Sequence, residues 1–398
     1  MPLTPPDDVS ALPEPSAEAR AHSERVVAEI ARSIAAAGGW IPLAEYMGAA
    51  LYAPGLGYYA SGTRKFGAEG DFVTAPEMTP LFGRALAAQL AEVLAQSGGD
   101  LVELGPGTGR LAAEVLGELA RRDALPDRYR LLEVSPELRA RQHDHLLDIV
   151  PALISRVEWI EVLPEHWHGA VIANEVLDAI PPHVVVRKQG SWYERGVAQS
   201  GDRLVLADKP LSTGALRTAA QALFPNDGDY ASEINPAAQA LVRSLAQRCK
   251  AGALLLIDYG FPAAEYYHDQ RSSGTLMAHY RHRTLADPLS FPGLVDLTAH
   301  VDFTAVAHAG AGTGMDVAGF STQATFLVNC GILDFLAGIG DVQSATYLRS
   351  ANAVHRLLSP AEMGELFKVL MLTRGIEISP LGFQSGDQRH RLEGFTTD

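Results

Sequence analysis

Acidic and amide side chains are concentrated in the stretch ANEVLDAIPPH, residues 173–183. Asn174, Glu175 and Asp178 follow an apolar run, which is typical of the end of a buried strand. A pair of carboxylates can hold a guanidinium group through its forked N–H donors. If a helical turn follows Asn174, the i, i+3 spacing directs Glu175 and Asp178 toward one pocket. We therefore predict that these three residues are catalytic, and capping of a helix N-terminus is the alternative, especially for Asp178.

A glycine-rich turn lies upstream, in LVELGPGTGRLAAEV at residues 101–115. Its glycines let the backbone turn tightly and approach a ligand, ahead of the unpaired N–H groups of a helix. A dinucleotide-binding turn would have Gly or Ala where this chain has Arg110, and no GK[ST] of a P-loop follows. A turn that only packs is the alternative to a cofactor site. The predicted cofactor-binding residues here are Glu103, Gly105, Pro106, Gly107, Thr108 and Gly109.

The charge of two acids indicates which cofactor the turn suits. Glu103 would repel phosphate groups, but it suits an ammonium group. Glu133 ends the apolar stretch YRLLE, and a carboxylate at the tip of a second strand can accept both hydroxyls of a ribose. A solvated acid at a strand end is the alternative for Glu133. We predict that Glu133 and Asn174 also contact the cofactor.

These residues must be positioned by alternating strands and helices. Strand-like segments end near residues 104, 133, 162, 174 and 258, and helical stretches follow at residues 110–122 and 136–149. Such alternation predicts an α/β fold with a parallel sheet covered by helices on both faces. The carboxyl ends of parallel strands share one edge, where ligands bind in open sheets.

The rest of the chain is predicted to surround this core. We expect a disordered tail at residues 1–16, an N-terminal helical and lid region at 17–78, and a core at 79–398. The first helix is predicted at residues 17–37, and Thr79 is predicted to cap the next long helix, ahead of Pro80. Two insertions are expected in the core, at about 181–228 after the fourth strand and about 261–292 after the fifth.

Composition narrows the possible partners. The 398 residues include 32 Lys and Arg against 47 Asp and Glu, a net charge of −15, which disfavours nucleic acid and suits a cationic protein segment. The cysteines, Cys249 and Cys330, lie in no metal-binding pattern, so neither a metal site nor a disulfide is expected. No apolar run is long enough to span a membrane, and the acidic N-terminal stretch is unlike a targeting signal, so we expect a cytoplasmic protein.

Over about residues 45–372 the chain resembles the MidA family, and the resemblance rests on five motifs in order. That family includes the mitochondrial methyltransferases that assist assembly of respiratory complex I. The motifs are GDFVTAPEMTPLFG at residues 70–83, VELGPGTGRL, ANEVLDAIPPH, LLLIDYG and GTLMAHYRHRTLADPLSFPGLVDLTAHVDF.

The resemblance implies a class I methyltransferase fold, Rossmann-like, that uses S-adenosylmethionine. It implies that residues 71–77, with Asp71 and Thr74 as cofactor contacts, form a lid over the cofactor, and that Asn174 and Glu175 flank the reaction centre. Many relatives have Arg where this chain has Thr108, which leaves Arg110 without an assigned role. A bacterial member is expected, whose methyl acceptor can differ from that of the mitochondrial proteins.

The first functional hypothesis is a protein arginine N-methyltransferase that acts on a respiratory complex I subunit during assembly. The partner would be an arginine-bearing protein, and exposed apolar residues on the C-terminal helices would allow a homodimer. Two alternatives stay open: a methyltransferase of small molecules, with the insertions enclosing its pocket, and a catalytically silent assembly chaperone on the same fold.

Overall fold

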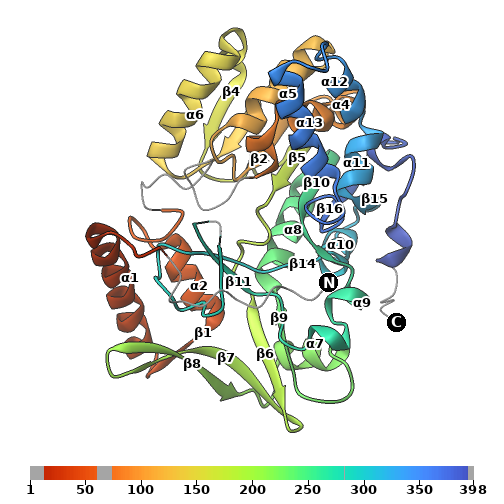
Figure 1. The fold of residues 1–398 in the computed structure, drawn as a ribbon. Coiled ribbons are helices and arrows are strands. Elements are labelled where there is room, and N and C mark those ends of the chain that lie inside the picture. The colour runs from red at the N-terminus through yellow and green to blue at the C-terminus, as the bar shows by residue number, and fades with distance from the viewer. Residues whose placement is uncertain (1–12, 61–73, 282, 393–398) are drawn as a thin grey trace. The chain divides into compact units, whose positions relative to one another are not determined.

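The computed structural model describes residues 13–60, 74–281 and 283–392, and the chain divides into two compact units (Figure 1). Unit 1 takes residues 1–72, 178–238 and 264–300. Unit 2 takes residues 73–177, 239–263 and 301–398. Most of both predicted insertions therefore falls in unit 1, which they share with the N-terminal residues. Most of the predicted tail at residues 1–16 lies outside the described residues.

Unit 2 is built on a sheet with the strand order β15-β16-β10-β5-β2-β3-β4, and the short β14 pairs with β10. Neighbouring strands run parallel, except that β16 is antiparallel to both β10 and β15. The strands are β2 (Asp100–Leu104), β3 (Tyr129–Leu132), β4 (Val157–Ile160), β5 (Trp167–Asn174), β10 (Cys249–Phe261), β14 (Val301–Asp302), β15 (Asp316–Thr322) and β16 (Phe367–Arg374). The chain order reverses beside β2, between β3 and β5, and a ligand crevice is expected there at the carboxyl edge.

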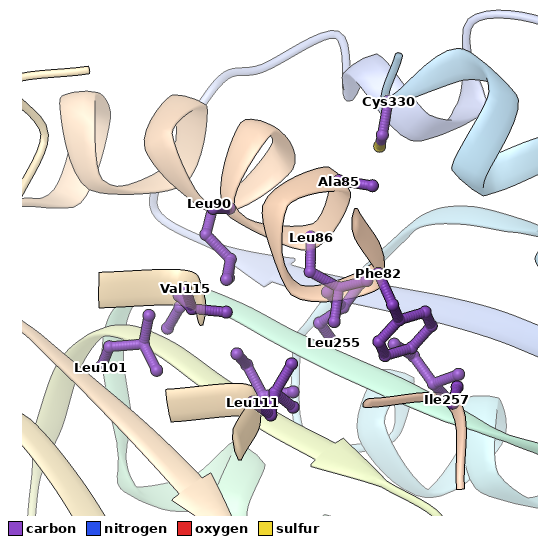
Figure 2. Packing of buried hydrophobic residues seen from close by; sticks show 14 of the residues in the cluster. Phe82, Ala85, Leu86, Leu90, Leu101, Leu111, Val115, Leu255, Ile257 and Cys330 are labelled. Carbon is purple, nitrogen blue, oxygen red and sulfur yellow. The ribbon is translucent and has the colours of Figure 1, made fainter. Parts of the chain in front are cut away.

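Helices cover both faces of this sheet, as the α/β prediction requires. They are α3 (Ala75–Met78), α4 (Pro80–Ser97), α5 (Arg110–Arg121), α6 (Pro136–Ile149), α10 (Phe303–Ala311), α11 (Gln323–Asn329), α12 (Ile332–Ala337) and α13 (Ala345–Leu358), while α8 (Pro236–Arg248) crosses into unit 2 from unit 1. Figure 2 shows Leu255 and Ile257 of β10 packed with the apolar side chains of α4 and α5. On the opposite face, α10 approaches so closely that a Cβ on Gly310 would collide with Leu372.

Local signals explain where these helices begin. Thr79 caps α4 by accepting a hydrogen bond from the Leu81 N–H, and Pro80 takes the first helical position, as predicted. Ser135 caps α6 in the same way through the Leu138 N–H, at 3.3 Å. The predicted helices at 110–122 and 136–149 are confirmed to within one residue. Both cysteines are unpaired and buried, and Cys330 belongs to the core in Figure 2.

Unit 1 combines two small antiparallel sheets with helices. One sheet has the order β1-β7-β6-β9 with β8 beside β7, and the other has the order β12-β11-β13. The elements are α1 (Ala17–Ala36), β1 (Trp40–Pro42), α2 (Leu43–Tyr52), β6 (His183–Lys188), β7 (Ser191–Ser200), β8 (Arg203–Pro210), α7 (Ala215–Leu223), β9 (Tyr230–Ile234), α9 (Ala263–Tyr266), β11 (Met277–Tyr280), β12 (Arg283–Leu285) and β13 (Asp296–Thr298). The hairpin of β6 and β7 turns at Gln189 and Gly190, both at positive φ.

The predicted amphipathic helix is α1, which buries Val26, Ile30 and Ile34. It packs within unit 1, where the Ser23 hydroxyl donates to the Pro292 carbonyl at 2.9 Å. In the described part of the chain no helix is both long and apolar enough to cross a bilayer, and those same residues hold no cluster of three metal-binding side chains.

Candidate active site

The glycine turn between β2 and α5 has the conformation that the sequence predicts. Gly105, Gly107 and Gly109 all have positive φ, at 61°, 51° and 82°. A Cβ on Gly105 would lie 3.0 Å from Val176, and one on Gly109 would lie 3.3 Å from Gln142. A Cβ on Gly107 would meet nothing within 4 Å. The turn therefore needs glycine for its backbone, and it leaves open space beside Gly107 for a ligand.

Glu103 belongs to β2, two residues before Gly105 of this turn, and is almost completely buried, with 2% of its surface exposed. The hydroxyl of Tyr129 on β3 donates to its carboxylate at 2.7 Å. Burial raises the pKa of Glu103 to about 7, because the charged form loses water. A cation bound beside this carboxylate would favour its ionised form, which fits the predicted preference for an ammonium group.

Glu133 follows β3 and is held by groups that the sequence did not single out. Its carboxylate accepts hydrogen bonds from the Ser135 N–H at 2.8 Å and from Gln142 Nε2 at 3.2 Å. Gln142 Nε2 also donates to the Gly107 carbonyl at 2.9 Å, while its Oε1 accepts from the indole of Trp159 at 2.8 Å. Gln142 thus connects the glycine turn to Glu133. In the sequence, Gln142 stands out only as a polar residue four positions before Leu146, and the structure buries both on the same helix.

The segment after β5 departs from the expected geometry. No helical turn follows Asn174, because Glu175 has a left-handed backbone with φ at 54° and residues 177–180 form bends and turns. Both the shared helical face for Glu175 and Asp178 and the helix-capping alternative are therefore wrong. Buried Asp258 holds the segment instead, by accepting from the N–H groups of Val176 at 3.2 Å and Leu177 at 2.9 Å.

Asn174 and Glu175 are brought together at the carboxyl edge. Asn174 Nδ2 donates to Glu175 Oε1 at 3.1 Å, and the Ala75 N–H of α3 lies 3.4 Å from the same oxygen. The other oxygen of the amide, Asn174 Oδ1, is buried and has no hydrogen-bond partner among the residues that the structure describes. An unpaired buried acceptor at a site edge is costly unless a ligand supplies the donor.

Besides the Ala75 N–H, the described part of the predicted lid contributes Glu77 of α3 to the site. Its carboxylate accepts from the Thr108 hydroxyl and from Arg110 Nη1, the latter at 3.1 Å, so Arg110 gains the role that the sequence left unassigned. Thr74 precedes α3 and makes no side-chain capping bond, and its contact with the cofactor stays a prediction. Asp71 lies outside the described residues.

Asp178, the third predicted catalytic residue, belongs to unit 1. It is buried, and its carbonyl accepts from the Ala299 N–H at 3.0 Å. Its part in catalysis stays a prediction.

Comparison with known proteins identifies the family. Residues 81–321, more than half of the chain, match a family described as S-adenosyl-L-methionine-dependent methyltransferases. The chain belongs to the MidA family of S-adenosylmethionine-dependent methyltransferases. The MidA assignment agrees with the five motifs.

Relatives of this MidA-family protein extend over most of its length. It is 30% identical to the mitochondrial protein arginine methyltransferase NDUFAF7 homolog of Drosophila melanogaster, over 92% of this chain and 88% of that protein. It is 30% identical to the mitochondrial NDUFAF7 of Danio rerio, over 87% and 86%. A solved protein of Burkholderia thailandensis, bound to S-adenosyl-homocysteine, is 46% identical with a TM-score of 0.92, covering 96% of this chain and all of that one.

The residues of this MidA-family site fit S-adenosylmethionine, the cofactor of the family. The open space beside Gly107 and the unpaired Asn174 Oδ1 are the two features that a bound molecule would satisfy. Glu133 would hold the ribose hydroxyls, and Glu103 would face the amino acid portion. When bound, the cofactor supplies an electrophilic methyl group on a sulfonium sulfur. The protein's part is to hold the acceptor in line with that group and to exclude water.

Proposed function

We propose that this methyltransferase transfers methyl groups to arginine side chains of a protein, on a respiratory complex I subunit during assembly. The observation that carries the proposal is the placement of Glu175, whose carboxylate is held beside Asn174 at the carboxyl edge by a left-handed backbone. The relatives named as protein arginine methyltransferases support the same substrate class. The predicted cytoplasmic location in a bacterium stays a prediction that cell fractionation would test.

Glu175 can do two things for a guanidinium acceptor. A carboxylate binds the forked N–H donors and so orients the group. It also holds positive charge on the nitrogens that do not react, which leaves a lone pair on the nitrogen that does. A left-handed conformation costs a non-glycine residue roughly 1 kcal/mol or more, and such strain is characteristic of functional sites.

Labelled methyl transfer tests the proposal. The purified protein is incubated with methyl-labelled S-adenosylmethionine and extract of its own organism, and the acid-hydrolysed protein fraction is analysed for methylarginines. We expect labelled methylarginine, and we expect the acceptor to be a complex I subunit by mass spectrometry of strains with and without the gene. Label found only in small molecules, or in lysine, would contradict the proposal.

Glu175→Gln separates catalysis from cofactor binding. We expect kcat to fall about 100-fold or more, because the neutral amide cannot localise charge on the acceptor. Affinity for S-adenosyl-homocysteine should stay within about twofold, since a Gln can keep the contacts to Asn174 and Ala75. The matched control is Glu165→Gln, which removes an exposed acid of the same unit. A Glu175→Gln enzyme as active as this control would exclude the assigned role.

A further inference from the structure

Unit 1 contains a cluster of tyrosines and acids that the cofactor site does not use. The cluster consists of Tyr52, Tyr59, Asp178, Asp296 and Thr298. Tyr52 ends α2, Tyr59 lies in the turn that follows, and Asp296 and Thr298 belong to β13. All five residues are described parts of one compact unit, and they come from three separate stretches of the chain.

Two aromatic rings form one wall of the cluster. The rings of Tyr52 and Tyr59 are stacked with centroids 5.6 Å apart, and Tyr58 meets Tyr59 edge-on at 5.1 Å. Tyr52 is 44% exposed, so a ligand can reach this wall from solvent. Tyrosine faces attract cations, and a planar guanidinium can stack on them.

The second wall is anionic. The hydroxyl of Tyr59 donates to Asp296 Oδ1 at 2.8 Å, and the hydroxyl of Tyr52 donates to the Ala179 carbonyl, next to Asp178, at 2.9 Å. Burial and the charges of Asp178 and Asp296 together raise the pKa of both phenols. The negative charges of both carboxylates are therefore felt at the same two phenols. Such a cluster favours a positively charged ligand.

An unsatisfied hydroxyl points to a ligand as well. Thr298 is only 3% exposed, and its Oγ1 has no hydrogen-bond partner among the described residues. Because it follows Asp296 by two positions on β13, its side chain projects from the same face of the strand. A buried hydroxyl without a partner is costly, and a donor from a bound molecule would remove that cost.

We propose that this cluster binds a second arginine side chain of the protein acceptor, distinct from the one that Glu175 holds for methylation, and prefers it to lysine; this inference rests on the proposed function. A guanidinium has five N–H donors in one plane, enough to reach two carboxylates and the Thr298 hydroxyl while its face lies on Tyr52. An ammonium group has three donors and no flat face.

The test uses the full-length protein with S-adenosyl-homocysteine bound. The probe is a fluorescein-labelled glycine-rich peptide with one arginine, and its counterpart has lysine at the same place. We expect the wild type to bind the arginine peptide at least about tenfold more tightly, and Asp296→Asn to lose that advantage. Asp202→Asn, which removes an exposed acid of the same unit, should bind as the wild type does.

A second pair of variants avoids the buried core. With a peptide that carries two arginines as substrate, Tyr52→Leu removes the exposed ring and should raise KM about tenfold with kcat within about twofold, while Tyr52→Phe should keep KM near that of the wild type. The affinity for S-adenosyl-homocysteine should not change in either. If the wild type methylates arginine but Tyr52→Leu and Asp296→Asn behave like Asp202→Asn, the cluster has no such role. If the wild type binds cofactor but methylates no arginine, the proposed function itself fails.

Discussion

Glu103 is the residue whose ionisation most directly couples the site to pH. Its pKa rises from 4.5 to about 7 on folding because of burial. The folded protein therefore holds more protons than the unfolded chain between those values, so this group favours the fold below about pH 4.5 and loses that contribution as pH rises through about 7. The full effect is on the order of 3 kcal/mol.

Glu103→Gln should remove this dependence, because the amide can still accept from Tyr129 but does not ionise. We expect the free energy of unfolding of the variant, relative to the wild type, to rise between about pH 4.5 and about pH 7. Urea unfolding of the cofactor-free proteins measures it. Equal pH profiles for the two proteins would contradict the assigned pKa. The variant should also bind S-adenosylmethionine more weakly, since its neutral side chain cannot attract the amino group that Glu103 is predicted to face.

Gln142 is the second residue on which the site depends. Gln142→Leu removes the donor to Gly107 and Glu133 and leaves the indole of Trp159 unsatisfied. We expect about tenfold weaker binding of S-adenosyl-homocysteine and a loss of roughly 1–3 kcal/mol of stability. Trp159→Phe is the control, because it keeps both bonds donated by Gln142, and its cofactor affinity should stay within about twofold. Calorimetric titration measures the affinity of both variants. Equal affinities would argue against a role of Gln142 in connecting Gly107 to Glu133.

At the scale of elements, the side chain of Glu77 connects α3 to the glycine turn. Glu77 accepts from Thr108 at the turn and from Arg110 at the start of α5. The ion pair alone contributes at most about 1 kcal/mol, because Arg110 is 41% exposed. The hydrogen bond to Thr108 is the contact that ties the element to the cofactor loop.

Glu77→Ala should loosen α3, although Arg110 still donates to the backbone carbonyl of residue 77. We expect faster amide exchange at residues 75–78 and about tenfold weaker cofactor binding, since the element loses its bond to Thr108 of the turn. Hydrogen-exchange mass spectrometry and calorimetry measure the two effects. Glu137→Ala, which breaks an exposed ion pair with Arg141 on α6, is the control and should change neither. Unaltered exchange in Glu77→Ala would show that other contacts hold α3.

Strand ends and helix starts could be predicted from the sequence, because helix caps, the spacing of apolar residues and glycine turns each depend on only a few neighbouring residues. The helix at 136–149 and the Thr79 cap are examples. The segment after β5 was predicted wrongly for the opposite reason. Its course is set by Asp258, which is 82 residues from Val176 in sequence and accepts from the backbone of that segment. A contact over that distance leaves no periodic signal.

At the scale of the whole molecule, the division into two units has a thermodynamic consequence. The predicted cofactor residues that the structure describes lie in unit 2, so a ligand bound there would stabilise that unit by mass action, by about 2.7 kcal/mol at a hundredfold excess over Kd. We expect two calorimetric unfolding transitions, of which S-adenosyl-homocysteine shifts one upward. A single transition that moves as a whole would show that the units unfold together.

The sequence by itself determined the α/β class, the family and the glycine turn with Glu103 and Glu133, because these depend on residue type and on short spacings. Only the tertiary structure decided that Gln142 joins the turn to Glu133, that Glu77 holds Arg110, and that Glu175 takes a left-handed backbone. It also joined both insertions and the N-terminal residues in one unit. These features arise from contacts between distant parts of the chain. The energies of such contacts depend on burial and on the orientation of the side chains, which no local sequence pattern predicts.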